Sequence, residues 1–422
     1  MAVHRHALTI AGALFTALLT YTPYSAGYDS SPSFATIYNF TSTNGQYPAG
    51  GLAIGGGGVL YGTTAYGGTY GFGAVFSLTP PAAPGASWTE NVLYSFQGGA
   101  DGGLPYAALA ISAGGTLYGT TSGSEPSNAG TVFSLTPPAS AGGAWTEKVL
   151  HAFAGAGGVG PSSLAIGRDG VLYGTTGGGG GGVCSLGCGT VFSLAPLGSP
   201  GGAWTPAVVY TFTGGADGSN PAAGVVIGND GVLYGTTIGG GANTVGTVFS
   251  LTPPATTGSA WTEAVLHSFD GIDGENPDTP VVIGVGEVLY GVAFGGIAGG
   301  GTIFSLAPPE FQGGVWSMTV LHNFQGGILV YPAPGPVVLS PSGVLYGTTQ
   351  SGGSAQHGTV FALKPPASSG GSWTEVPLHA FGQFGEAYPL GGVVVGSGGV
   401  LYGTTSVYYG ASYTGSVFSL TL

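Results

Sequence analysis

The tripeptide Leu-Tyr-Gly recurs along the chain at a nearly constant interval. Its tyrosines stand at positions 61, 118, 173, 234, 290, 346 and 402 of the 422 residues. Successive copies are 57, 55, 61, 56, 56 and 56 residues apart. A fixed period of this length indicates one supersecondary unit that is copied and stacked, so the repeat constrains the fold more than any other feature of the sequence.

Two other motifs accompany the tripeptide. The first, Gly-[Thr/Ala/Ser]-[Val/Ile]-Phe-[Ser/Ala]-Leu, places its phenylalanine at positions 76, 133, 192, 249, 304, 361 and 418. The second is a run that begins with Trp and ends with Phe. It occurs only six times, from the tryptophans at positions 88, 145, 204, 261, 316 and 373.

Each unit contains four short runs rich in Val, Leu, Phe, Tyr, Thr and Trp, separated by the turn residues Gly, Pro and Ser. In the second unit these runs are Ala107–Ile111, Thr116–Thr121, Thr131–Leu135 and Trp145–Phe153. Four strands per unit at this period predict a propeller blade. We therefore expect an all-β, seven-bladed β-propeller with four antiparallel strands in each blade.

The unequal motif counts predict how the ring closes. The chain stops just after the seventh Phe motif, so the seventh blade lacks its Trp strand. The segment 34–40 (FATIYNF) matches the end of that strand, as in VLYSF and VLHSF. We expect this N-terminal strand to complete the last blade, which removes two sheet edges that an open ring would expose.

The combined pattern V-L-Y-G-T-T, G-T-V-F-S-L-T-P-P and W-T-E-x-V-L-H-S-F resembles the GloVer-type "choice-of-anchor tandem repeat" proteins, over residues 34–422. This resemblance implies an extracellular bacterial protein with propeller-like repeats. It implies no catalytic residue and no defined activity.

Composition excludes several classes of function. Gly (88) and Pro (29) are abundant, but 43% hydrophobic and 5% charged residues predict a buried core rather than disorder. Seventeen acidic residues face four basic ones, which excludes nucleic acid and anionic membrane surfaces as partners. The sequence contains no G-x-S-x-G, H-E-x-x-H or P-loop motif, so we expect no catalytic residue, no resident metal and no cofactor.

The N-terminus predicts export. A short basic start precedes the apolar run 7–20, which is typical of a signal peptide over residues 1–26, followed by a linker (27–33) and the propeller (34–422). The alternative is a buried or anchoring N-terminal helix. We expect a secreted, cell-surface or periplasmic protein without membrane insertion after signal removal. In that setting Cys184 and Cys188 favour a local disulfide over a two-thiol metal site.

Histidines and acids near the strand ends invite a metal interpretation. His151, His267, His322 and His379 share one repeat position, but tyrosine occupies it in the other three units, which favours packing over metal binding. The glutamates of Trp-Thr-Glu are interpreted as solvated charges. The densest acidic cluster is Asp270, Asp273, Glu275 and Asp278, our candidate for Ca²⁺, although Asp-Gly pairs also simply form tight turns.

Ligand contact is predicted on the variable loops between the second and third strands. The first such loop carries Tyr66, Tyr70 and Phe72, and the last carries Tyr408, Tyr409 and Tyr413. Ring closure would make these blades neighbours and join the six aromatics into one patch, suited to carbohydrate or to an extracellular protein partner. The alternative is that the rings only cover glycine-rich loops. Two functions follow: a non-catalytic binding or scaffold propeller, or a glycan-active lyase or hydrolase that uses acids at the channel.

Overall fold

A computed structural model describes most of the chain. The described residues are 31–83, 85–123, 129–140, 142–198, 202–256, 258–311, 313–325, 336–368, 370–382, 387–409 and 412–422. The predicted signal peptide (1–26) and most of the predicted linker lie outside them. Residues Pro32–Leu422 form one compact unit.

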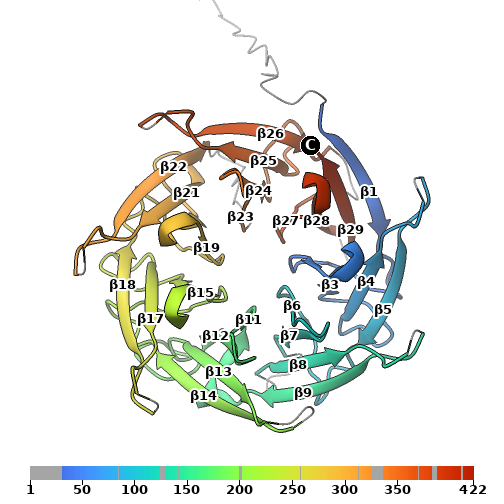
Figure 1. The fold of residues 1–422 in the computed structure, drawn as a ribbon, viewed down its shortest axis with the longest axis horizontal. Helices are drawn as coiled ribbons and strands as arrows, with labels where there is room; N and C mark the ends of the chain where they lie inside the picture. The colour runs from blue at the N-terminus through green and yellow to red at the C-terminus, as the bar shows by residue number, and fades with distance from the viewer. Residues whose placement is uncertain are drawn as a thin grey trace, which may run out of the picture. The chain divides into compact units, whose positions relative to one another are not determined.

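This unit is a ring of seven four-stranded antiparallel sheets (Figure 1). From the axis outwards, blade 1 contains β2 (Ala53–Ile54), β3 (Leu60–Thr64), β4 (Ala74–Thr79) and β5 (Thr89–Ser95), and blade 2 contains β6 (Ala110–Ile111), β7 (Leu117–Thr121), β8 (Thr131–Thr136) and β9 (Thr146–Ala152). Blade 3 contains β11 (Ala165–Ile166), β12 (Leu172–Gly178), β13 (Thr190–Pro196) and β14 (Trp204–Thr211), and β10 (Val159–Pro161) also pairs with β12. Blade 4 contains β15 (Val226–Ile227), β16 (Leu233–Thr237), β17 (Thr247–Thr252) and β18 (Thr262–Ser268).

Blades 5 to 7 follow the same order. They contain β19 (Val282–Ile283), β20 (Leu289–Ala293), β21 (Gly299–Ala307) and β22 (Ser317–Gln325); β23 (Val338–Leu339), β24 (Leu345–Thr349), β25 (Thr359–Lys364) and β26 (Thr374–Ala380); and β27 (Val393–Val395), β28 (Leu401–Tyr409), β29 (Ser412–Thr421) and β1 (Ser33–Asn39). Short 3₁₀ turns are η1 (Gly56–Gly58), η2 (Gly155–Gly157), η3 (Asn229–Gly231), η4 (Val285–Glu287) and η5 (Ser397–Gly399). The predicted seven-bladed propeller is confirmed.

The repeated motifs are explained by packing between blades. The Phe that ends each Trp run meets the Phe motif of the next blade edge to face, as Phe96 meets Phe133 with ring centroids 5.1 Å apart. The Leu-Tyr-Gly tyrosine meets the next blade's tryptophan, as Tyr61 meets Trp145 at 6.0 Å. A Cβ on Gly62 would lie 2.5 Å from the Phe76 ring, so glycine at this place in the motif makes room for the buried phenylalanine. The motifs therefore hold adjacent blades together.

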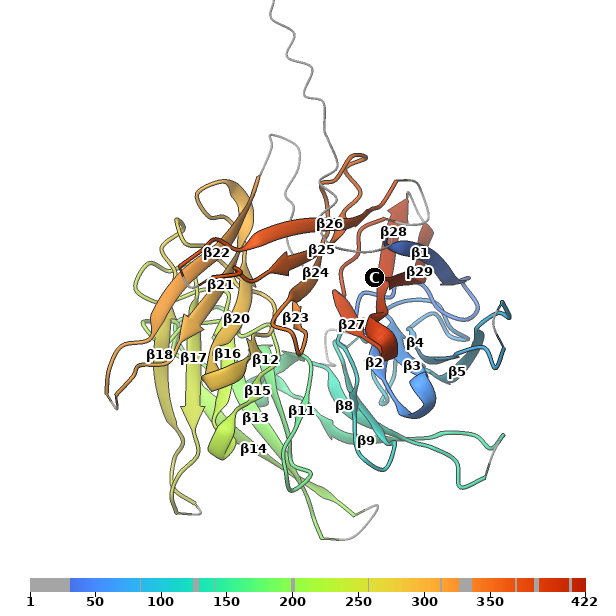
Figure 2. The same cartoon turned by 45° about the horizontal axis from the view of Figure 1, so that its top comes forward.

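The N-terminal strand closes the ring as predicted. In both views β1 lies beside β29 (Figure 1 and Figure 2), and the register pairs Ser33 with Thr421 and Asn39 with Ser416. Phe40, just after β1, meets Phe76 edge to face at 4.8 Å, so the closing junction repeats the aromatic contact of the other junctions. Ring closure therefore uses the same packing that joins blades elsewhere in the chain.

The perimeter junctions hold a polar contact that sequence reasoning missed. Near the end of one outer strand, a Tyr or His faces the Trp-Thr-Glu glutamate of the next. The Tyr38 hydroxyl donates to Glu90 Oε2 at 3.2 Å, and His322 Nε2 lies 3.3 Å from Glu375 Oε2. The prediction that these glutamates are solvated is wrong for three of them, because a carboxyl oxygen is buried without a hydrogen-bond partner in each of Glu90, Glu147 and Glu263.

Burial changes the proton affinity of these carboxyls. Desolvation, with a smaller contribution from the charge of Asp101, raises the pKa of Glu147 to about 7. Desolvation and the charge of Asp217 do the same to Glu263, whose pKa also rises to about 7. Both aspartates belong to the Asp-Gly turns, and each accepts a hydrogen bond from the tyrosine of its junction, at 2.9 Å from Tyr94 and 3.2 Å from Tyr210.

Candidate functional site

A cavity of about 960 Å³ lies on the axis of the ring. Its walls come mainly from the loops that lead from an outer strand into the innermost strand of the next blade, together with the β12–β13 loop of blade 3. Most lining residues are Gly, Ala, Ser and Pro, as in the segments 49–51, 107–108 and 160–163. These small side chains leave the axial space open. Because the β12–β13 loop lines it, the cavity lies on the face where the variable loops emerge.

One repeat position in the cavity wall is occupied by different types of residue in different blades. It lies 12 residues before each Leu-Tyr-Gly tyrosine. Among the described residues, four of the six copies are apolar and two are the exceptions Tyr106 and Asp278. The six residues are Ala49, Tyr106, Pro161, Ala222, Asp278 and Leu390, and all of them line the cavity. A residue type shared by all blades serves the fold, so the two exceptions at the axis are the candidates for a role other than packing.

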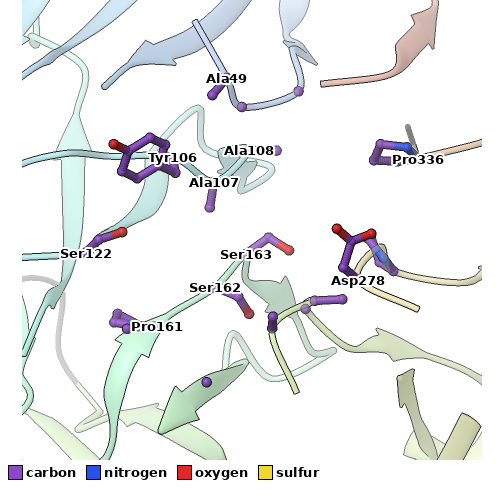
Figure 3. A pocket seen from close by; sticks show the side chains of 18 of the residues that line it. Ala49, Tyr106, Ala107, Ala108, Ser122, Pro161, Ser162, Ser163, Asp278 and Pro336 are labelled. Carbon is purple, nitrogen blue, oxygen red and sulfur yellow. The ribbon is translucent and has the colours of Figure 1, made fainter. Parts of the chain in front are cut away.

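Asp278 is the one carboxylate among the described residues that line the cavity. Its carboxyl group points into the open space, and Ser162 and Ser163 lie on the neighbouring wall (Figure 3). Although the side chain is open to the cavity, the surrounding walls displace bulk water, and this desolvation raises the pKa of Asp278 to about 6. An acid with a pKa near neutrality at the axis can bind a cation or exchange a proton.

A tyrosine cluster lies at the rim of the cavity. Tyr106 lines the wall and keeps 37% of its surface exposed. Its hydroxyl is 2.8 Å from that of Tyr66, on the β3–β4 loop, and the two rings are edge to face. Tyr47 packs edge to face against Tyr66 with centroids 6.1 Å apart. The cluster joins the predicted aromatic loop of blade 1 to the axial cavity.

The other aromatics of the predicted patch take different places. Tyr70 is exposed at 56%, whereas Phe72 is half-buried and packs against the core between blades 1 and 2. Tyr408 and Tyr413 face each other in the β28–β29 hairpin as backbone partners. The side chains of Tyr408, Tyr409 and Tyr413 lie outside the described structure. A joint patch of six rings therefore stays a prediction, while Tyr66 is the member that reaches the cavity rim.

The acidic loop does not assemble a cation site from the described residues. Asp270 accepts hydrogen bonds from the backbone N–H groups of Ile272 and Asp273 and so stabilises the turn, and those bonds lower its pKa. Asp273 Oδ2 lies 2.7 Å from His267 Nε2. Asp278 lies instead at the axis. Throughout the described ranges, no three His, Cys, Asp or Glu side chains gather as metal ligands. Asp270 and Asp273 bond to the backbone of the turn and to His267, and the side chain of Glu275 lies beside Gly295.

Cys184 and Cys188 form a disulfide in the β12–β13 loop, with Cα atoms 5.1 Å apart. Cys184 lines the axial cavity, and Cys188 is buried in the core between blades 3 and 4. The bond therefore fixes one segment of the cavity wall to the body of the ring.

Reducing this disulfide will change the free energy of unfolding by at most about 2 kcal/mol, because cross-links that span so few residues remove little entropy from the unfolded chain. Urea titrations with and without a thiol reductant measure the change. Loss of the cooperative transition on reduction would contradict this expectation and show that blade 3 needs the bond to fold.

Sequence reasoning missed Tyr106 and gave Asp278 a different role. The signal was present, because the segment 10 to 12 residues before each Leu-Tyr-Gly tyrosine supplies cavity-lining residues from every blade. Comparison of the seven copies at this offset would have singled out both residues as exceptions.

The fold and the cavity define a seven-bladed β-propeller with an axial site on its variable-loop face. The model of the Gloeobacter/Verrucomicrobia repeat family matches residues 22–187 and 184–418. The chain belongs to this family. No curated protein matches it significantly. Among the described residues, no helix combines the length and apolar character that a membrane crossing requires.

Solved structures share the architecture at low sequence identity. A Bacteroides uniformis protein named as a 6-phosphogluconolactonase is 16% identical, with a TM-score of 0.53 over 84% of this chain and 88% of that one. A Thermus thermophilus protein named as an oxidoreductase (glucose dehydrogenase) is 17% identical, with a TM-score of 0.44 over 76% of this chain and 94% of that one. The first likeness supports the propeller fold and nothing finer.

Proposed function

We propose that this protein is an exported, non-catalytic binding propeller that holds a carbohydrate at the axial cavity and its tyrosine rim. The observation that carries the proposal is the broken symmetry at the axis, where Tyr106 and Asp278 replace the apolar residues found at the equivalent described positions. The leader-like composition of residues 1–20 supports export.

The chemistry of the wall suits a polyhydroxylated ligand. Ser122, Ser162, Ser163 and Asn220 offer hydroxyl and amide groups, which donate and accept hydrogen bonds. The exposed face of Tyr106 offers an apolar surface on which a sugar ring can stack. A concave site with a few polar groups and an aromatic wall is the usual form of a small-ligand site.

The alternative, a glycan-active enzyme, is favoured by one observation, the raised pKa of the axial Asp278, since a general acid needs a pKa near the working pH. Glycoside hydrolysis generally uses two carboxyl groups about 5 to 10 Å apart. Among the described lining residues Asp278 has no carboxylate partner, so the non-catalytic function is the better supported of the two. Incubation with the polysaccharides that bind, followed by a reducing-end assay, tests the alternative.

Tyr106→Ala will weaken glycan binding at least tenfold, because it removes the exposed aromatic wall of the cavity, and a factor of ten corresponds to about 1.4 kcal/mol. The fold should tolerate the change, since Ala49 and Ala222 occupy the same repeat position. A glycan array identifies ligands, and calorimetry compares the two proteins.

Tyr70→Ala is the matched control. This tyrosine is also exposed and lies on the same loop as Tyr66, but it does not line the cavity. Affinity should stay within twofold of the parent chain. A protein that binds no glycan on the array, or that loses affinity through Tyr70→Ala and not through Tyr106→Ala, would remove the axial site as the binding site.

A further inference from the structure

The axial Asp278 differs from the turn aspartates in having no hydrogen-bond partner on another described residue. Asp101 accepts hydrogen bonds from Tyr94 and Gln97, and Asp217 accepts them from Tyr210 and Thr213. Within the described chain, Asp278 accepts a hydrogen bond from its own backbone N–H and from no other residue. Because the Asp278 side chain is exposed to the cavity, a ligand can supply the hydrogen-bond donor that the described residues do not.

The charge of the cavity restricts that ligand. No Lys, Arg or His is among the described lining residues, and the whole chain has a formal net charge of −13. An anionic ligand would be repelled, and a neutral one would leave the ionised carboxylate without a counterion. A ligand with a positive charge offsets the desolvation of Asp278 and is attracted by the field of the protein.

A bare divalent cation does not fit the same site. Ca²⁺ requires six to eight oxygen ligands at short range. In the described part of the chain no three potential metal-ligating side chains gather, at the axis or elsewhere. The serine hydroxyls and glycine-rich walls beside Asp278 suit an organic cation that brings its own hydroxyl groups.

The positions of Tyr106 and Asp278 around the ring indicate the size of the ligand. Tyr106 precedes the innermost strand of blade 2, and Asp278 precedes that of blade 5, three blades further around a ring of seven. In Figure 3 they lie on opposite sides of the cavity. A ligand that contacts both must span the axis, which favours an oligosaccharide over a single sugar.

We propose that the axial cavity selects oligosaccharides that contain an unacetylated amino sugar, with Asp278 as the counterion of the ammonium group and Tyr106 as the stacking surface. This inference rests on the carbohydrate-binding function proposed above. Asp278 then determines specificity, because it distinguishes an amine from an acetamide or a hydroxyl at one position of otherwise similar glycans.

Calorimetric titration with three hexasaccharides of β-1,4-linked glucosamine, N-acetylglucosamine and glucose tests the proposal. The glucosamine oligomer should bind the parent chain at least tenfold more tightly than the other two, and glucosamine monomer should bind more weakly than its oligomer. Asp278→Asn should remove that preference and leave the affinity for the neutral oligomers unchanged. The preference should also weaken at high salt, since it depends on an ion pair.

Asp230→Asn is the matched control for the loss of one negative charge. Asp230 is exposed in the 3₁₀ turn between β15 and β16, which is on the face opposite the variable loops, and its positive φ of 55° is one that asparagine tolerates. This variant should keep the preference for the glucosamine oligomer. Thermal melting confirms that each variant is folded.

The outcomes separate this inference from the proposed function. Equal affinity for all three oligomers, or a preference that survives Asp278→Asn, overturns the amino-sugar inference and leaves carbohydrate binding in place. If none of the three oligomers and no glycan on the array binds, both the amino-sugar inference and the proposed carbohydrate-binding function are overturned. Tight binding of Ca²⁺ that Asp278→Asn abolishes would replace the amino-sugar site with a metal site.

Discussion

Deleting residues 1–41 will abolish cooperative folding, whereas deleting residues 1–31 will leave the melting temperature nearly unchanged. The longer deletion removes β1, which forms the outer edge of the seventh blade by pairing with β29. It also removes Phe34, which stacks on His379 at 3.8 Å and contacts Phe381 and Phe418. The shorter deletion retains all of these contacts.

The size of the effect follows from the aromatic contacts. Loss of a buried phenylalanine side chain costs about 3 to 5 kcal/mol. The deletion removes the buried Phe40 and the half-buried Phe34, together with the pairing along one strand. A domain has a total stability of about 5 to 15 kcal/mol. The remaining ring would expose the β29 edge and the ring of Phe76, so we expect aggregation or a non-cooperative transition.

A circular permutation provides the control. Thr421 at the end of β29 pairs with Ser33 at the start of β1, so a short glycine turn after Leu422 could lead directly into residues 33–41. Adding this segment to the C-terminus of the truncated chain should restore a cooperative melt. Differential scanning calorimetry of the four proteins measures the result. A truncated chain that melts like the full one would show that blade 7 is stable without β1.

The repeat made the ring predictable because each motif performs the same packing task in every blade. Counting Trp runs against Phe motifs revealed the missing strand, and Phe40 on Phe76 completes it as a junction like the others. Such inferences need only sequence order and period, since equivalent residues occupy equivalent environments.

The candidate site was less predictable, because it is built from differences between copies. Tyr106 and Asp278 are 172 positions apart and line the same cavity only because the ring places seven equivalent loops around one axis. The same limit applied at the perimeter, where the charge of Glu147 raises the pKa of Tyr94, a residue of the preceding blade. The motif that contains a residue does not indicate which residue the neighbouring repeat places beside it.

The protein will lose stability as the pH rises from about 5 to 8, and the perimeter carboxyls Glu147 and Glu263 will account for much of the loss. Each has a folded pKa of about 7, above the ordinary value of 4.5, so the folded state binds a proton more tightly than the unfolded state. The stabilisation is therefore complete below about pH 4.5 and is lost as the pH rises through 7.

Glu147→Gln and Glu263→Gln test this, because glutamine resembles the protonated acid and cannot ionise. At pH 8 each substitution should raise the free energy of unfolding by about 1 kcal/mol, a value reduced from the full effect of the pKa shift because solvent screens these half-buried groups. The double variant should gain about 2 kcal/mol, since the sites belong to non-adjacent junctions and should be additive. Below about pH 4.5 the variants and the parent should be equally stable.

Two other junctions supply internal controls. At the junction of blades 7 and 1, Asn44 stands where three other turns have aspartate. Hydrogen bonds from Tyr38 and Asn44 oppose the desolvation that raises the pKa of Glu90. Asp101→Asn should accordingly reduce the pH dependence contributed by Glu147. At the junction of blades 5 and 6, Glu375 pairs with His322, so Glu375→Gln should bring no gain at pH 8.

Urea titrations at half-unit pH intervals give the free energy of each protein. Comparison of variant with parent at the same pH cancels the contribution of Asp278, whose raised pKa of about 6 acts in the same direction. A glutamine variant that is no more stable than the parent at pH 8 would show that the pKa of its carboxyl is not raised in the folded ring.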